Sequence, residues 1–199
     1  MTVVDMKRLL LALMFGASTL VIAAAPPPQE SVLQLTNTFT DQAGKNFHLP
    51  DRRGHVQIVS MFYTSCTVTC PLMIDSGLGI EHALKPAQRN ALRILLVSFD
   101  PQRDTPAVLA ALAVKRHLDA QRWTLARTDD AGVRTFAALL GVRYRRIAGG
   151  DFNHTSGLIL LDAEGRILAK TDQLGAVPDP KFLSAVRAAL DKPAQAVNH

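Results

Sequence analysis

The 199-residue sequence is poor in the residues that build several common scaffolds and sites. It holds only two cysteines, so it can form at most one internal disulfide, and a core of this size does not need one. Aromatic residues make up 6% of the chain and are not interleaved with basic residues, which argues against nucleic-acid binding. The absence of internal repeats and of long low-complexity stretches leaves one domain of ordinary size.

Neither charge sign dominates the chain. The formal net charge at pH 7 is +5, from 22 lysines and arginines against 17 aspartates and glutamates. The arginines are spread through the sequence rather than gathered in one segment. We therefore expect at most a weakly basic surface that favours acidic partners or anionic lipid.

The one long apolar run, residues 9–25, is short for a membrane span, which needs about 20 apolar residues. It follows Lys7 and Arg8 and ends in small residues, which is the pattern of an export signal. Cleavage is expected near residues 23–25, although Pro26 disfavours the bond after Ala25, and an uncut segment would serve as an inner-membrane anchor. No cysteine lies nearby, which excludes lipid attachment there. Export predicts a periplasmic, oxidising location, where a thiol pair must be kept reduced by another molecule or protected by metal.

The two cysteines lie at an expected strand-to-helix turn. Cys66 and Cys70 are separated by three residues, after a β-branched and apolar run at residues 56–62 and before a helical segment from Leu72. Pro71 fits the first turn of that helix, where a missing N–H is tolerated. Cys70 should lie near the positive end of the helix macrodipole, which favours its thiolate. Two such sulfurs can close on each other or bind one soft metal ion.

A purely structural disulfide is the simpler alternative for this pair. A bridge across so short a loop removes little entropy from the unfolded chain, less than the roughly 3 kcal/mol expected for a 15-residue loop. Two unrelated buried cysteines are a further alternative, but burial alone does not explain their placement on a turn. Both structural alternatives are therefore weaker than a functional pair.

The remaining pattern alternates strands and helices. The expected strands are residues 33–40, 44–49, 56–62, 93–99, 123–125, 142–147, 157–161 and 166–170, with the first two joined by a turn at 41–44. The expected helices are residues 70–84, 106–118, 131–140 and 180–190, with Gly141 ending the third and a polar, glycine-rich loop at 149–156. This alternation predicts an α/β, thioredoxin-like fold, in which helices flank a central mixed sheet and an N-terminal β-hairpin is added.

Four stretches of the sequence resemble the Sco/SenC family of copper-binding, thioredoxin-fold proteins that serve cytochrome c oxidase assembly. They are the cysteine segment 62–71, the segment 98–106 with Asp100, Arg103 and Asp104, the segment 151–165 with His154, and the hairpin at 41–45. The spacing of three residues between the cysteines is informative because ordinary thioredoxins carry two. The chain departs from the family in having Thr67, Val68 and Thr69 between its cysteines, where the family has a proline and an acidic residue.

The resemblance implies a Cu(I) site formed by Cys66, Cys70 and the distant His154. Thiolate and imidazole donors suit soft Cu(I), whereas a structural zinc site would need a fourth ligand, and none stands out. The implied function is a copper chaperone that delivers Cu(I) to the CuA centre on the copper-bearing subunit of cytochrome c oxidase. Periplasmic copper carriers and thiol reductants are further implied partners. The implied domains are a signal peptide or anchor (1–25), a linker (26–32), the copper-binding domain (33–192) and a flexible tail (193–199).

Two other functions remain open from the sequence. A thiol-disulfide oxidoreductase could reduce client cysteines with Cys66 and Cys70 alone, forming a redox disulfide between them. A copper or redox sensor would signal without delivering metal. The other notable side chains are expected to be packing, surface, turn or capping residues: Met61, Tyr63, Met73, Asp100, Arg103, His48, His55, His82, His117 and His199. Two of them have an alternative: Asp100, which ends a central strand, could support the metal ligands, and Tyr63 could pack against the site.

Overall fold

A computed structural model describes residues 26–192, so the expected signal or anchor segment (1–25) and tail (193–199) lie outside the described residues. Within residues 26–192, none of the helices combines the length and apolar character needed to cross a membrane. Residues 29–34 are folded against the domain, since the Ser31 hydroxyl donates to the Glu164 carbonyl and Val32 is buried.

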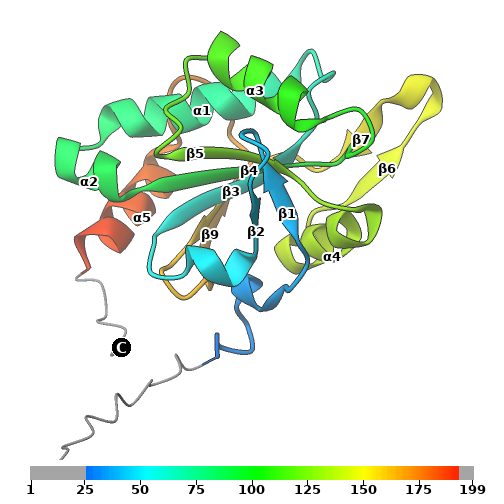
Figure 1. Cartoon of the computed structure of the whole chain (residues 1–199). Helices are drawn as coiled ribbons and strands as arrows, with labels where there is room; N and C mark the ends of the chain where they lie inside the picture. The colour runs from blue at the N-terminus through cyan, green and yellow to red at the C-terminus, as the bar shows by residue number, and fades with distance from the viewer. Residues whose placement is uncertain (1–25, 193–199) are drawn as a thin grey trace, which may run out of the picture.

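The core is a seven-stranded mixed sheet with the strand order β2-β1-β5-β4-β3-β8-β9 (Figure 1). The three central strands, β3, β4 and β5, are parallel, and the pairs β1–β5, β3–β8 and β8–β9 are antiparallel. Strands β3 and β4 are almost wholly buried, as expected for apolar strands covered on both faces. The strands are β1 (Phe39–Asp41), β2 (Asn46–Phe47), β3 (Gln57–Phe62), β4 (Arg93–Ser98), β5 (Trp123–Arg127), β8 (Leu158–Leu161) and β9 (Ile167–Thr171).

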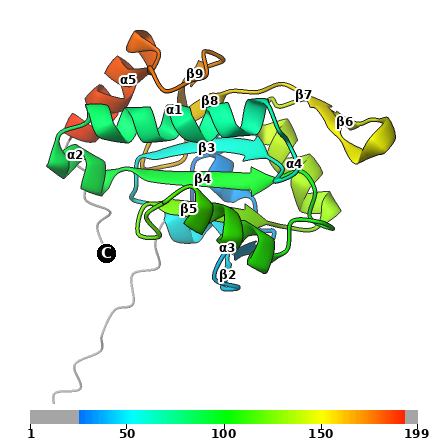
Figure 2. The same cartoon turned by 90° about the horizontal axis from the view of Figure 1, so that it is seen from above.

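Helices cover both faces of this sheet, which confirms the predicted fold class. Helix α1 (Thr69–Ala83) and helix α3 (Pro106–Lys115) lie over one face, and α4 (Asp130–Leu140) lies over the other (Figures 1 and 2). Helix α2 (Pro86–Ala91) follows α1 and is joined to α5 (Pro180–Asp191) by a hydrogen bond from Gln88 to Asp191. Helix α4 ends at Gly141 in the left-handed conformation, as the sequence predicts.

The N-terminal hairpin forms, but its strands are shorter than expected. Residues 33–40 begin with a 3₁₀ turn, Val32–Gln34, because the Ser31 hydroxyl accepts from the Leu33 N–H and caps it. Residues 44–49 pair only at Asn46–Phe47, since Pro50 lies in the first turn of a second 3₁₀ segment, Leu49–Arg52. The predicted turn at 41–44 is present between the two strands.

Part of the loop expected at residues 149–156 is instead the return strand of a second hairpin. Strand β6 (Tyr144–Arg146) pairs with β7 (Phe152–His154) in a separate two-stranded sheet, and Ala148–Gly150 makes the turn between them. The pairing is stabilised by stacking of Tyr144 and Phe152 on Phe99, with ring centroids 5.0 and 5.9 Å away. His154 therefore projects from a strand that packs on the core, not from an open loop.

Candidate metal centre

The structure brings together the three side chains that the sequence proposes as metal ligands. The candidate donor atoms of Cys66, Cys70 and His154 all lie within 4.8 Å of one another. The two cysteines are not joined by a disulfide. Among the described residues, this is the one group of three or more histidine, cysteine or acidic side chains close enough to hold an ion.

Backbone geometry sets the positions of the two sulfurs. The chain turns after β3, where the Cys66 N–H donates to the Tyr63 carbonyl, and α1 then begins at Thr69. The Cys70 N–H, in the first turn of α1, donates to the Cys66 Sγ at 3.3 Å. A spacing of three residues thus places one sulfur before the helix and the other within its first turn, both at the same end.

The two thiols differ in their acidity. Burial raises the pKa of Cys66, but hydrogen bonds from the backbone around Cys70, Val68 and Thr69 outweigh it and hold the pKa of Cys66 below its ordinary value. Burial raises the pKa of Cys70 far above its ordinary value. The expected thiolate at Cys70 is therefore wrong: Cys66 is the partly exposed, more acidic thiol, because burial of Cys70 outweighs the helix dipole.

His154 is held by ring contacts and by its Nδ1 atom. Its imidazole packs against Phe99 and Tyr63, with centroid distances of 4.9 and 5.9 Å. Nδ1 lies 3.1 Å from the Thr155 carbonyl oxygen, which can only accept, and 3.1 Å from the Ser156 hydroxyl, which can accept or donate, so a proton on Nδ1 is compatible with both contacts. That tautomer leaves the lone pair of Nε2 free for a metal ion, as is usual when a ligating histidine is oriented by a carbonyl.

A buried carboxylate fixes the start of the cysteine loop. Asp104 accepts from the Thr64 N–H at 3.1 Å, and also from the hydroxyls of Thr64 and Ser98. Asp104 is 1% exposed, so these bonds supply the partners that its carboxylate would otherwise find in water. The loop that carries Cys66 is thereby tied to the segment after β4.

The same segment also holds the histidine hairpin. The carboxylate of Asp100, 1% exposed, pairs with Arg103 and accepts from Arg146 of β6 at 3.1 Å. The Arg103 guanidinium also donates to the Gly150 carbonyl in the hairpin turn. Residues 100–104 thus contact both the loop that carries Cys66 and the hairpin that carries His154.

The sequence assigns Asp100 and Arg103 to a turn or helix cap and offers a supporting role beside the metal ligands for Asp100 alone. It does not indicate the contacts that Arg103 and Asp104 make. A usable signal was present, because these residues follow β4, which is parallel to the cysteine strand β3. The carboxyl ends of neighbouring parallel strands meet at one edge of a sheet. Polar residues that follow β4 can therefore contact the cysteine loop, which follows β3.

Comparison with known proteins identifies the family. The family model described as SCO1/SenC matches residues 26–190. The chain belongs to the SCO1/SenC family. This confirms the resemblance that the cysteine, aspartate and histidine segments indicate.

Curated relatives of this SCO1/SenC protein are distant in sequence. The chain is 26% identical over 159 residues to the SCO1 protein homolog of Bacillus subtilis, a match that covers 76% of the chain and 80% of that protein. It is 25% identical over 134 residues to the SCO2-like protein RT0576 of Rickettsia typhi, covering 64% of each. With the Rickettsia relative, the match thus spans a little under two thirds of either chain.

Solved structures confirm the thioredoxin-like fold. BsSco, described as a Sco-family cytochrome c oxidase assembly protein with a disulfide switch, is 25% identical, has a TM-score of 0.68, and is matched over 84% of this chain and 98% of its own. ScoI of Bradyrhizobium japonicum with copper bound gives 20% identity and a TM-score of 0.65, over 77% of this chain and 96% of its own. Yeast Sco1 with copper bound is 21% identical, with a TM-score of 0.64, and the match covers 80% of this chain and 89% of yeast Sco1.

The other residues that the sequence singled out lie outside the donor set. Met61 and Met73 are buried core residues, as expected. Tyr63 is buried and stacks edge-on with both Phe152 and His154, so it packs against the site as well as the core. His55, His82 and His117 are exposed and His48 bonds to backbone carbonyls, while His199 lies outside the described residues.

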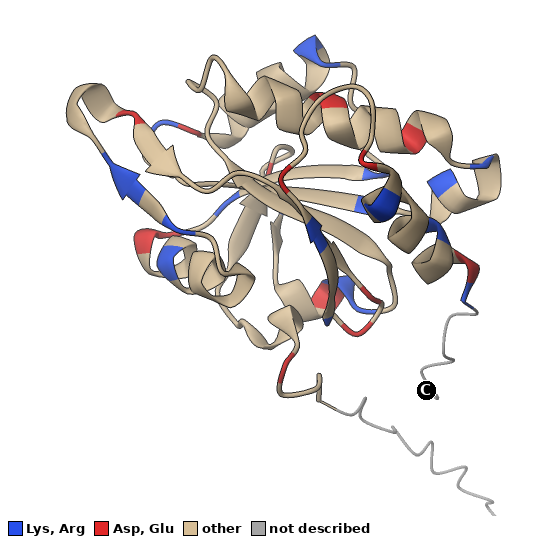
Figure 3. Cartoon of the chain, turned by 180° about the vertical axis from the view of Figure 1, so that it is seen from behind, with Lys and Arg blue, Asp and Glu red and all other residues tan. Residues whose placement is uncertain are grey.

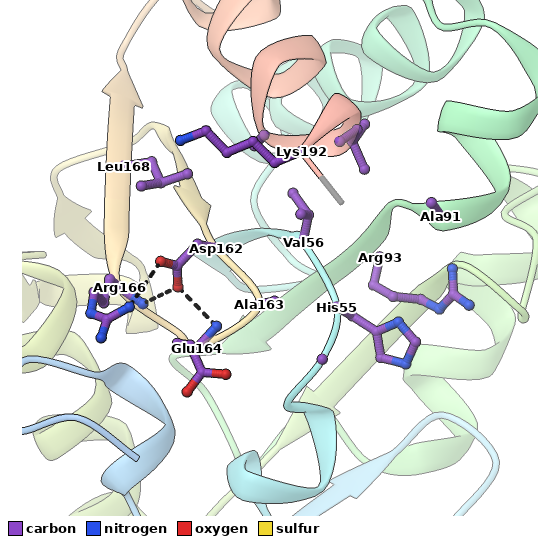
Figure 4. Close-up of a pocket in the computed structure, with 13 residues that line it drawn as sticks. His55, Val56, Ala91, Arg93, Asp162, Ala163, Glu164, Arg166, Leu168 and Lys192 are labelled. Atoms are coloured by element: carbon purple, nitrogen blue, oxygen red, sulfur yellow. Dashed lines mark hydrogen bonds and ion pairs between the residues drawn. The ribbon is translucent and has the colours of Figure 1, made fainter. Parts of the chain in front are cut away.

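Two surface hollows differ in their distance from the metal donors. One of about 490 Å³ opens beside Cys66 and His154, between the cysteine loop and the hairpin. A larger hollow of about 610 Å³ is lined by His55, Arg93, Asp162, Glu164, Arg166 and Lys192 among others (Figure 4). It contains neither cysteine and lies near the amino ends of β3 and β4, away from the donors. Of these two, only the smaller hollow borders donor residues. A third hollow, of about 320 Å³, is lined by both Cys66 and Cys70.

Proposed function

We propose that this protein binds one Cu(I) through Cys66, Cys70 and His154 and delivers it to the CuA centre of cytochrome c oxidase. The observation that carries the proposal is the convergence of two sulfurs and one imidazole within 4.8 Å. Membership of the SCO1/SenC family and the copper-bound relatives support it. The donor set fits the metal, because Cu(I) is soft and accepts low coordination numbers.

Transfer requires a site that holds the ion without enclosing it. Three protein donors leave room for an incoming thiolate or thioether of the client. Cys66 is partly exposed and lines the hollow together with His154, so a client side chain has a path to the ion. The buried Cys70 would remain as the anchoring donor while the two more accessible donors are exchanged.

The proposed setting is the periplasm, reached through the export signal at residues 1–25. The uncut segment would serve as a membrane anchor, and cleavage would release the domain. The proposed partners are the copper-bearing oxidase subunit, a periplasmic copper carrier that loads the site, and a thiol reductant that keeps the cysteines reduced.

Thiol-disulfide exchange is the second candidate function, and the unequal cysteines favour it. The Cys66 thiolate would attack a client disulfide and release one client thiolate. Cys70, after losing its proton, would attack the mixed disulfide, which releases the second client thiol and leaves a Cys66–Cys70 bridge. Two electrons pass to the client, and an external dithiol reductant restores the pair. The disulfide switch described for BsSco supports such a cycle.

The variant His154→Ala separates the two candidates. The histidine is a metal donor in the first and has no obligatory part in thiolate attack. We expect Cu(I) affinity to fall by at least the 10- to 100-fold that loss of an outer-shell partner costs. We expect the rate of disulfide reduction by the dithiol form to stay near that of the wild type.

In cells at limiting copper, the same variant should fail to support an active oxidase if copper delivery is the function. Added copper should restore part of the oxidase activity. A Cys66→Ser strain is the matched control, since it removes both functions. Normal oxidase activity in the His154→Ala strain would favour the reductase and exclude copper delivery through this site.

A further inference from the structure

The outward face of the β6–β7 hairpin is basic. Arg145 pairs with Asn153 in the hairpin register, whereas Tyr144 pairs with His154. Because side chains alternate along a strand, Arg143, Arg145 and Ile147 share the face opposite to Tyr144. Tyr144 stacks on the buried Phe99, so the face with the arginines points away from the core.

This face borders the hollow beside the donors. Val68 from the cysteine loop and Ile147 from the hairpin both line the hollow, and their exposed fractions are 70% and 42%. Large apolar side chains this exposed, on opposite sides of a concave site, resemble the apolar centre of a protein interface. Arg143 lines an adjoining hollow, and Ser156 is common to both hollows.

The hairpin that borders the hollow carries a net positive charge. Residues 143–155 hold three arginines and one aspartate, and residues 63–72 hold no charged side chain. Figure 3 shows the blue of Lys and Arg on one strand of this hairpin, at the left of the view. Arg146 is paired with Asp100, but among the described residues no ion pair engages Arg143 or Arg145. Asp151 is the acidic side chain that lines the hollow itself.

We propose that Val68, Ile147, Arg143 and Arg145 form a docking surface for an acidic protein partner. The partner's chemistry is a soft-donor loop, bearing cysteine or methionine, with aspartate or glutamate beside it. The apolar pair would contact the loop, and the two arginines would steer and orient its acidic border. A protein suits this surface better than a lipid headgroup does, because the recess leads to thiol donors. The inference rests on the proposed function, since it names a property of the copper recipient.

Charge reversal on the hairpin tests the surface. The variant is Arg143→Glu/Arg145→Glu. The matched control is Lys181→Glu in α5 with Lys192→Glu directly after it, which makes the same change in net charge. Both control lysines are exposed. Helix α5 lies at the opposite side of the molecule from the hairpin (Figure 2). The probe is the purified copper-bearing domain of the oxidase subunit, and the readout is its rate of copper uptake from each Cu(I)-loaded protein.

We expect the hairpin variant to transfer copper about tenfold more slowly than the wild type at low ionic strength. The difference should shrink at about 1 M salt, where charges are screened within roughly 3 Å. The control should stay near the wild-type rate. Cu(I) affinity should be the same in all three proteins, because no ligand is changed. Should the double variant fold poorly by circular dichroism, Arg145→Gln replaces it, with a smaller slowing expected.

The possible outcomes test the docking surface separately from copper delivery. Equal transfer rates for hairpin variant and control overturn the docking surface and leave copper delivery intact. A wild-type protein that binds copper but passes none to the domain overturns delivery and the recipient named here. If the arginine substitutions weaken binding to phosphatidylglycerol vesicles but leave copper transfer unchanged, the surface binds a membrane and not a protein partner.

Discussion

At the scale of single residues, the two cysteines are chemically unequal. Cys66 is partly exposed, and backbone N–H groups lower its pKa, whereas burial raises the pKa of Cys70. A thiolate is the reactive form of cysteine, so access and pKa act in the same direction here. Iodoacetamide should therefore alkylate Cys66 first in the reduced protein. Peptide mass spectrometry at a series of times would give the two rates.

The pH profile of this labelling follows from the same shift. A thiolate forms as pH rises through the folded pKa, so the labelling rate of Cys66 should reach half its maximum below the pH at which an ordinary thiol does. Cys70 should stay slow over the same range. The Cys66→Ser variant is the control, and it should label only slowly. Equal rates for both cysteines would contradict the assigned asymmetry.

The sequence predicted the position of both sulfurs but assigned the thiolate to the wrong one. The spacing and Pro71 correctly indicate a helix start, and the macrodipole favours charge at either sulfur there. Burial decides between them, and it depends on Tyr63, α1 and the core around Cys70. No local pattern in the cysteine segment 62–71 indicates that burial.

At the scale of elements, residues 100–104 link the two parts of the metal centre. Asp104 binds Thr64 before the cysteines, and Asp100 with Arg103 binds Arg146 and Gly150 of the hairpin. Neither contact involves a donor atom. The segment therefore sets the distance between the cysteine loop and His154 without coordinating the ion.

Asp104→Asn tests this positioning role. An amide cannot accept all three hydrogen bonds from Thr64 and Ser98, so we expect a loss of about 1–3 kcal/mol in unfolding free energy. We also expect weaker Cu(I) binding with the same ligands. Urea unfolding and competitive Cu(I) titration measure the two effects. Unchanged Cu(I) affinity in the variant would show that the segment supports the fold alone.

Helix α1 owes its close packing to a glycine that helix propensity disfavours. A Cβ on Gly77 would lie 2.5 Å from the buried Trp123 ring, which also donates to Glu81 of α1. Gly77→Ala should destabilise the protein, although alanine gains about 1 kcal/mol of helix propensity. A lower urea midpoint checks this. The Cu(I) affinity of Gly77→Ala should be retained, so this variant is a control for Asp104→Asn. A urea midpoint above that of the wild type would contradict the close packing.

Most strands and helices were predicted well, and the segments that were missed or overextended are short. Strands β3 and β4 and helices α1 and α4 are each continuous apolar or amphipathic segments of six or more residues. Helix α2 and strand β7 were not predicted, and strands β1 and β2 are shorter than expected; these four elements are two to six residues long. Such short segments depend on caps and on contacts with distant residues, such as Tyr144 on Phe99.

At the scale of the whole molecule, the sheet order explains how a residue 84 positions after Cys70 reaches it. The β6–β7 hairpin leads directly into β8, and β8 pairs with β3, which carries the cysteine loop at its end. Periodicity predicts the strands but not which strand follows which in the sheet. The association of His154 with the cysteines therefore came from the family resemblance, and the topology now supplies its physical basis.

X-ray absorption spectroscopy of the reduced, Cu(I)-loaded protein tests the central claim most directly. Our account predicts a low-coordinate copper ion with two sulfur neighbours and one nitrogen neighbour. The nitrogen contribution should disappear in His154→Ala, and both sulfurs should remain. A wild-type spectrum with no nitrogen neighbour, or one that does not change in His154→Ala, would contradict the three-residue site.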